Sequence, residues 1–204
     1  GLFNNLRIKF LGPHQLINST LSISLVSGIF IRNRENLKTS VLKKGLQNTS
    51  WPARFEIVSQ TPLIILDGAH NVASARVLVE TLKQNFLEKK IILVLGISRD
   101  KDIKGITQEL FPIAQKVILT CADNSRAVRP RDILCAGKAF LKDKNAALTR
   151  SVPGALKMVR NCAAGDSLVL VTGSLFVVGE ARGIIKNLPA LPTLTAGRRQ
   201  ADGR

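Results

Sequence analysis

From residue 61 onward, short apolar runs alternate with segments in which apolar residues recur every three or four positions. Runs of Leu, Ile and Val without polar alternation are typical of strands buried on both faces of a parallel sheet. We expect five such strands, at Leu63–Leu66, Ile91–Leu95, Val117–Thr120, Ala146–Leu148 and Leu168–Thr172. The pattern predicts an α/β fold, a Rossmann-like, mostly parallel sheet with helices on both faces.

The segments between these runs predict the covering helices. One apolar stripe with helical spacing follows the first run and consists of Ala75, Leu78, Val79, Leu82 and Phe86. Further helices are expected over residues 102–111, 130–141, 152–163 and 175–187. Pro130 stands near the first turn of one of them, and Ser151 is a candidate N-cap of another.

The first fifty residues have a different pattern. We expect a strand at Leu6–Leu11, a long apolar helix at Leu16–Ile31 and a second helix at Glu35–Leu46, a piece that cannot close a domain by itself. Polar residues and Pro52 follow, so residues 49–60 are predicted to be a linker. The expected division is residues 1–48, the linker, a domain at 61–188 and a disordered basic tail at 189–204.

Composition adds a preference for anionic partners. The 204 residues are 45% hydrophobic, which is enough for a core, and 30 Lys plus Arg against 14 Asp plus Glu give a net charge of +16. Such a charge favours nucleotides, polyanionic substrates or nucleic acid. Aromatic residues make up 4% of the chain and Tyr is absent, which disfavours binding of single-stranded nucleic acid by base stacking.

The cysteines and the apolar segments bear on the compartment. Cys121, Cys135 and Cys162 are odd in number and lack metal-ligand spacing, as expected of reduced thiols. No apolar run approaches the roughly 18 residues that span a bilayer, and the N-terminus lacks the layout of a signal peptide. We therefore expect a soluble, cytoplasmic protein without membrane contact.

Four polar loops follow the predicted strands: DGAHN (67–71), GISRDKD (96–102), CADNSR (121–126) and GSLF (173–176). In open parallel sheets, ligands bind beyond the carboxyl ends of the strands. We expect all four loops at the same edge of the sheet, where their side chains are candidates for a binding site.

Each candidate residue in these loops also has a structural reading. Asp67 can accept hydrogen bonds from ribose hydroxyls, or it can brace a loop or cap a helix. His70 can bind an anionic group, although a lone histidine is usually structural. Lys101 lies before a helix, where a carboxylate or phosphate is favoured, or belongs to a solvated charge run. Ser174 can donate to an anion or simply cap its helix.

Two further candidates precede the predicted sheet. The guanidinium of Arg54 suits a phosphate by its bidentate fork. Asn18 lies one turn after His14 on the long apolar helix, and its amide can pair with the edge of adenine, unless both are ordinary polar residues of a helix start. The sequence has no GxxxxGK[ST], GxGxxG or HExxH motif, so these residues alone do not hold nucleotide phosphates.

Five segments, taken in order, resemble the C-terminal part of folylpolyglutamate synthase, which is also dihydrofolate synthase in its bifunctional bacterial form. They are GPHQLINS (12–19), GLQNTSWPARFE (45–56), ILDGAHNVASA (65–75), GISRDKD (96–102) and VLVTGSLFVVGEAR (169–182). The resemblance covers about residues 1–188 and places the chain in the Mur ligase superfamily of ATP-dependent amide-bond-forming enzymes.

The resemblance implies a reaction and its participants. In that family ATP phosphorylates a substrate carboxylate, and the amine of an amino acid attacks the acyl phosphate. The implied cofactors are ATP and Mg²⁺, the implied substrates are L-glutamate and a folate or dihydropteroate, and the implied state is a monomer. By the same resemblance, Asn18 contacts the adenine, Arg54 the terminal phosphates and Asp67 the ribose. The implied glutamate-binding positions are His70, Lys101 and Ser174, with His70 and Lys101 as candidate catalytic residues.

The sequence departs from the family in two ways. The family has Gly where Ala53 stands and Pro where Val72 stands. Its phosphate loop, its magnesium-binding acids and most of its folate pocket would lie upstream of Gly1, so residues 1–48 resemble a remnant of the central ATP-binding domain. We expect such a truncated piece not to turn over alone. The alternatives are a fragment of a cell-wall Mur ligase, a non-catalytic basic nucleic-acid-binding module, and a degenerate chain without function.

Overall fold

One mixed sheet organises the molecule. The computed structural model describes residues 3–142, 146–163 and 166–187. Within these ranges six strands pair in the order β1-β2-β6-β3-β4-β5. All neighbouring pairs are parallel except β1 against β2, which confirms the predicted mostly parallel sheet. The strands are β1 Glu56–Gln60, β2 Leu63–Leu66, β3 Lys90–Leu95, β4 Lys116–Leu119, β5 Ala146–Leu148 and β6 Ser167–Thr172.

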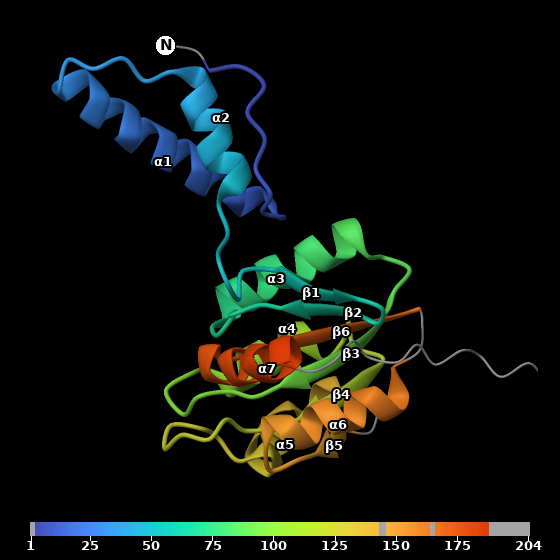
Figure 1. Cartoon of the computed structure of the whole chain (residues 1–204). Coiled ribbons are helices and arrows are strands. Elements are labelled where there is room, and N and C mark those ends of the chain that lie inside the picture. The colour runs from blue at the N-terminus through green and yellow to red at the C-terminus, as the bar shows by residue number, and fades with distance from the viewer. Residues whose placement is uncertain (1–2, 143–145, 164–165, 188–204) are drawn as a thin grey trace, which may run out of the picture.

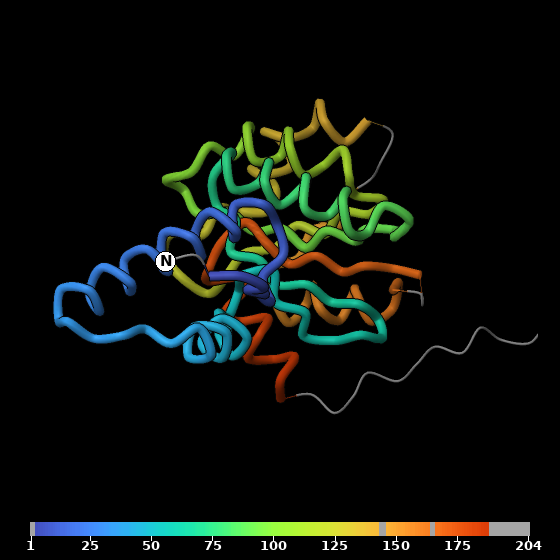
Figure 2. Tube along the Cα trace, turned by 90° about the horizontal axis from the view of Figure 1, so that it is seen from above, coloured from blue at the N-terminus to red at the C-terminus, as the bar shows by residue number. Residues whose placement is uncertain are grey.

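Helices cover both faces of the sheet because successive strand residues point to opposite sides. Leu63 and Ile65 of β2 belong to the core under one helix layer, while Ile64 and Leu66 belong to the core under the other. Figure 2 shows the two layers on opposite sides of the strands. The first layer comprises α3 Val72–Asn85, α4 Ile103–Leu110 and α5 Pro130–Gly137, followed by the 3-10 helix Lys138–Phe140; the second comprises α6 Val152–Cys162 and α7 Leu175–Asn187.

Two helices stand apart from the sheet (Figure 1). They are α1 (Pro13–Arg32) and α2 (Thr39–Asn48), and no residue of α1 is buried. An 18-residue window of the 20-residue α1 has a mean hydropathy of 1.2, so by length and composition this helix is able to span a membrane. The prediction that no segment reaches that length was wrong, since the serines and Gly28 do not interrupt the helix. Core helices of soluble proteins and signal sequences have comparable length and composition.

The N-terminal predictions needed the most correction. Residues 6–11 form no strand, and the sheet is built from residue 56 onward. The second helix begins at Thr39, not Glu35. Residues 56–60 of the predicted linker form β1, which pairs with β2. The division of the chain into domains stays a prediction, and the predicted tail at 189–204 lies outside the described residues.

Candidate functional site

Hydrogen bonds bring the four polar loops together at the carboxyl edge of the sheet. The backbone N–H of Gly173 donates to the carbonyl of Ala69 at 3.0 Å, which joins the loops after β6 and β2. The hydroxyls of Ser98 and Ser174 lie 3.4 Å apart, which joins the loops after β3 and β6. The N–H of Arg99 donates to the carbonyl of Arg126 at 2.9 Å and adds the loop after β4. The prediction of one shared edge is confirmed.

Gly173 makes the first of these contacts possible. Its φ of 97° lies in the left-handed region, and a Cβ there would stand 2.5 Å from a methyl carbon of Leu95 and 2.6 Å from the carbonyl of Gly96. Only glycine fits this position without moving the neighbouring strand. The close approach holds Ser174 and the start of α7 against the loops that carry His70 and Lys101.

Asp67 braces its own loop. Its Oδ2 accepts the N–H of Phe55 at 2.9 Å and its Oδ1 accepts the N–H of Ala69 at 2.8 Å. Burial raises the pKa of this carboxyl against the opposing effect of these two N–H groups and of the Arg54 charge. Asp67 therefore braces its loop, as one of the two interpretations of the sequence predicts. Each oxygen retains a second lone pair, so a ligand hydroxyl can still donate to it.

His70 is held by the same loop. Its Nδ1 lies 2.8 Å from the carbonyl of Gly68, which can only accept, so Nδ1 carries the proton in the neutral ring and Nε2 is an acceptor. The next residue, Asn71, forms a capping box with Ser74 at the start of α3. The crowding of polar groups in DGAHN thus has a local cause, and it leaves the Nε2 edge of His70 for a ligand.

Lys101 is paired in the loop after β3. Its ammonium lies 2.7 Å from Asp100, whose other oxygen accepts from Arg126 at 2.8 Å. These two cations hold the pKa of Asp100 well below its usual range. An ammonium has three donors, so Lys101 can bind a second carboxylate while it keeps Asp100.

Ser174 caps the first turn of α7. Its hydroxyl oxygen accepts the N–H of Phe176 at 3.2 Å, and only 4% of the residue is exposed. The sequence left two roles open for Ser174, helix capping and donation to an anion; the hydrogen bond that the structure shows is the capping one. Direct binding of a ligand by Ser174 requires the hydroxyl proton, which the Ser98 hydroxyl at 3.4 Å can also accept.

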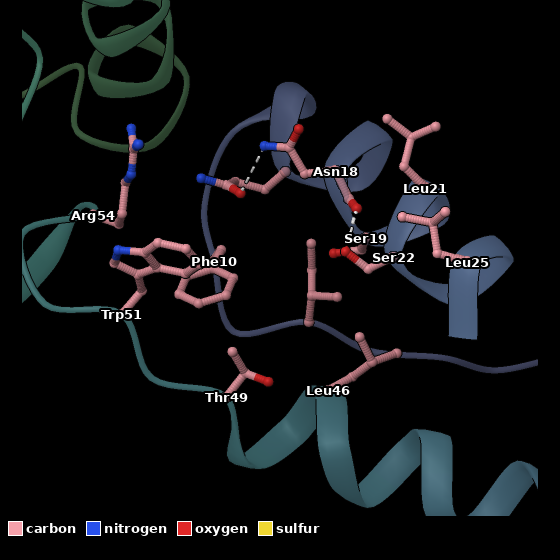
Figure 3. A pocket seen from close by; sticks show the side chains of 12 residues that line it. Phe10, Asn18, Ser19, Leu21, Ser22, Leu25, Leu46, Thr49, Trp51 and Arg54 are labelled. Atoms are coloured by element: carbon pink, nitrogen blue, oxygen red, sulfur yellow. Dashed lines mark hydrogen bonds between the residues drawn. The ribbon is translucent and has the colours of Figure 1, made fainter. Parts of the chain in front are cut away.

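The three residues assigned to a nucleotide line two adjoining cavities. One, of about 490 Å³, lies between α1, α2 and the chain before β1, and it includes Asn18 and Arg54 (Figure 3). The other, of about 320 Å³, includes Arg54 and Asp67. Arg54 therefore belongs to both, while Asn18 and Asp67 lie on either side of it.

Trp51 also lines the larger cavity, and the sequence did not indicate it as a site residue. The residue was assigned to a linker because Pro52 follows it. One signal was available, since Trp51 is the single tryptophan of the chain and tryptophan is enriched at binding interfaces.

Within the ranges that the structure describes, no three His, Cys, Asp or Glu side chains gather in a group able to hold a metal ion. Magnesium at a phosphate site is usually bound by one or two carboxylates together with substrate phosphates and water.

Comparison with known proteins identifies the family. Residues 53–175 match the family described as Mur ligase, glutamate ligase domain. The chain belongs to this family. The matched residues include Arg54, Asp67, His70, Lys101 and Ser174, so these five candidate residues lie inside the glutamate ligase domain.

The chain is also similar to individual folylpolyglutamate and dihydrofolate synthases. The chain is 28% identical to the dihydrofolate synthase/folylpolyglutamate synthase of Bacillus subtilis, over 90% of this chain and 42% of that protein. A Mycobacterium tuberculosis folylpolyglutamate synthase complexed with ADP has a TM-score of 0.82 at 26% identity, over 93% of this chain and 44% of that one. For the Thermotoga maritima folylpolyglutamate synthase the TM-score is 0.76 at 29% identity, over 92% and 42%. The glutamate ligase domain and its flanking residues thus span less than half the length of these relatives.

Proposed function

We propose that this chain is part of an ATP-dependent ligase that joins L-glutamate to the carboxylate of a folate or dihydropteroate through an acyl phosphate. The observation that carries the proposal is the meeting of the loops that bear His70, Lys101 and Ser174 at one edge of the sheet. The names of the similar proteins from Bacillus subtilis, Mycobacterium tuberculosis and Thermotoga maritima support it.

The proposed glutamate site uses a cation and an acceptor on neighbouring loops. Lys101 binds a carboxylate of the incoming glutamate and keeps its contact with Asp100. The Nε2 of His70 accepts a hydrogen bond from the ammonium or from the attacking amine, because its Nδ1 proton is held by Gly68. Ser174 completes the site at the start of α7, where the helix dipole favours an anion.

The proposed nucleotide site lies on the other side of Asp67. Asn18 contacts the adenine, Asp67 the ribose and Arg54 the terminal phosphates, which matches the order of these residues along the two adjoining cavities. The complex of the Mycobacterium tuberculosis relative with ADP supports the presence of a nucleotide site. Because the sequence has no GxxxxGK[ST] motif, we propose that these 204 residues alone do not transfer the γ-phosphate.

Binding of L-glutamate tests the proposed site directly. Titration calorimetry of the 204-residue chain should show binding of L-glutamate, and Lys101→Ala should weaken it by about tenfold or more, as expected for loss of a charge-assisted bond. Lys104→Ala removes an exposed cation from the adjacent helix and is the matched control. Equal affinity of both variants, or no binding of L-glutamate to the unaltered chain, would contradict the assignment.

The absence of turnover is tested separately. The chain is mixed with ATP, Mg²⁺, L-glutamate and either dihydropteroate or tetrahydrofolate, and products are measured by mass spectrometry. We expect no glutamate adduct. An adduct formed by the chain alone would show that the phosphate-transfer machinery is complete in these residues and would refute that part of the proposal.

A further inference from the structure

Trp51 is placed where a large aromatic ring meets solvent. It is the single tryptophan of the chain, and 63% of it is exposed at the cavity of about 490 Å³. Tryptophan ordinarily buries its large apolar surface. An exposed indole at the wall of a cavity of this size, within the range of small-molecule sites, is consistent with a flat ligand that covers it.

The turn after Trp51 is held in a strained conformation. Ala53 and Phe55 have φ values of 62° and 46°, in the left-handed region that residues with a Cβ avoid. The carbonyl of Ala53 accepts the N–H of Gly68 at 2.8 Å, and the N–H of Phe55 donates to Asp67. Strain of this kind persists only where surrounding contacts impose it, and it is concentrated at functional sites. Here it fixes the turn that carries Trp51 to the loop of the proposed site.

The same turn brings an aromatic face and a cation together. The N–H of Arg54 donates to the carbonyl of Trp51 at 3.3 Å, and both side chains line the cavity (Figure 3). A planar base on the indole would thus lie near a guanidinium suited to phosphate. The pairing of one exposed ring with one such cation fits a single nucleotide better than a strand, which needs successive stacking surfaces.

Two amides form the wall opposite, on α1. The side-chain N–H of Asn18 donates to the side-chain oxygen of Gln15 at 3.3 Å. This bond leaves the oxygen of Asn18 as an acceptor, and the amide nitrogen of Gln15 and the second N–H of Asn18 as donors. Adenine offers the complementary pair, a donor at N6 and an acceptor at N1, whereas guanine offers the reverse at O6 and N1.

We propose that Trp51 stacks on the purine base of the bound nucleotide and that Gln15, which orients Asn18, makes the site select adenine over guanine. The inference rests on the proposed function for the contact of Asn18 with adenine and of Arg54 with phosphate. It adds two residues with separate tasks. Trp51 supplies affinity for any purine, and Gln15 supplies the distinction between the two bases.

The experiment uses Trp51 itself as the reporter, because the fluorescence of tryptophan in the 204-residue chain comes from this residue alone. ADP, GDP and inorganic pyrophosphate are titrated, and equilibrium dialysis with labelled ADP measures binding independently. We expect ADP to quench the fluorescence, GDP to bind more weakly, and pyrophosphate to leave the signal unchanged. Trp51→Ala should raise the Kd for ADP about 5- to 100-fold, while Trp51→Phe should stay close to the unaltered chain.

The outcomes separate this inference from the proposed function. Dialysis that shows ADP bound equally to the unaltered chain and to Trp51→Ala would overturn stacking and leave the nucleotide site standing. A Gln15→Ala variant that keeps the full preference for ADP over GDP would overturn the role of Gln15. If ADP does not bind to the unaltered chain, both the proposed nucleotide site and the roles of Trp51 and Gln15 are contradicted. Circular dichroism of each variant confirms that the fold is retained.

Discussion

Replacement of Asp67 by asparagine is the most informative single change, because the carboxylate has two bonds that an amide cannot both make. Its two oxygens accept the N–H groups of Phe55 and Ala69 at 2.9 and 2.8 Å. In Asp67→Asn one of these N–H groups faces an NH₂ donor and loses its acceptor. An unsatisfied buried donor costs about 1–3 kcal/mol. For a chain of this length, 2 kcal/mol corresponds to a fall in the thermal midpoint of about 4–8 °C.

The assay compares thermal midpoints by circular dichroism. Asp132→Asn is the matched control, since Asp132 forms an exposed pair with Arg129 and should change the midpoint little. Burial raises the pKa of Asp67, so the folded chain binds this proton more tightly than the unfolded chain does. The stability that Asp67 contributes therefore falls as the pH rises from the pKa of the unfolded chain to the raised pKa of the folded chain. The difference in thermal midpoint between wild type and Asp67→Asn should be smaller above this pH window than below it. Equal midpoints for Asp67→Asn and the wild type would refute the bracing role.

Three further outcomes are expected. Gly173→Ala should destabilise the chain by about 2 kcal/mol or more, measured by urea unfolding, because its Cβ would meet Leu95 at 2.5 Å; an unchanged midpoint would contradict this geometry. Ala53→Gly should stabilise the chain by about 0.5 kcal/mol in the same assay by relieving a φ of 62°, and a loss of stability would show that no strain is stored there. Burial raises the pKa of Glu56, but hydrogen bonds and charge, chiefly from Arg182, outweigh it and hold that pKa below its ordinary value. This stability is present above the ordinary pKa of 4.5 and is lost as the pH falls through the lowered pKa of the folded chain, so Glu56→Gln should flatten the decline in stability below about pH 4.5. An equally steep decline in the variant would show that Glu56 is not its cause.

The sequence was most informative where both faces of a strand are buried. The run at Leu63–Leu66 has no polar residue, and the structure gives the same bounds. β1 was missed because it lies at the edge of the sheet, where Glu56 and Gln60 are polar and no long apolar run marks it. The segment 6–11 shows the opposite error, since alternation of apolar and polar residues does not make a strand without a partner to pair with.

The candidate site was predictable in position but not in contacts. The ends of the predicted strands located the loops, because parallel strands share one carboxyl edge. The partners of each side chain depended on the fold. Asp67 bonds to Phe55 twelve positions earlier, across a β-hairpin that the sequence did not indicate. Capping of α3 by Asn71 is local, and spacing alone would have sufficed to expect it.

The position of β6 in the sheet determines when the site can exist. This strand pairs with β2 on one side and β3 on the other, although it comes from residues 167–172, late in the chain. Without β6, this strand order leaves β1–β2 and β3–β4–β5 as two separate units, each with an open edge. His70 belongs to the loop of the first piece and Lys101 to that of the second. In the proposed assignment, glutamate binds between these two loops, so a nascent chain can form that proposed site only after β6 has paired with β2 and β3.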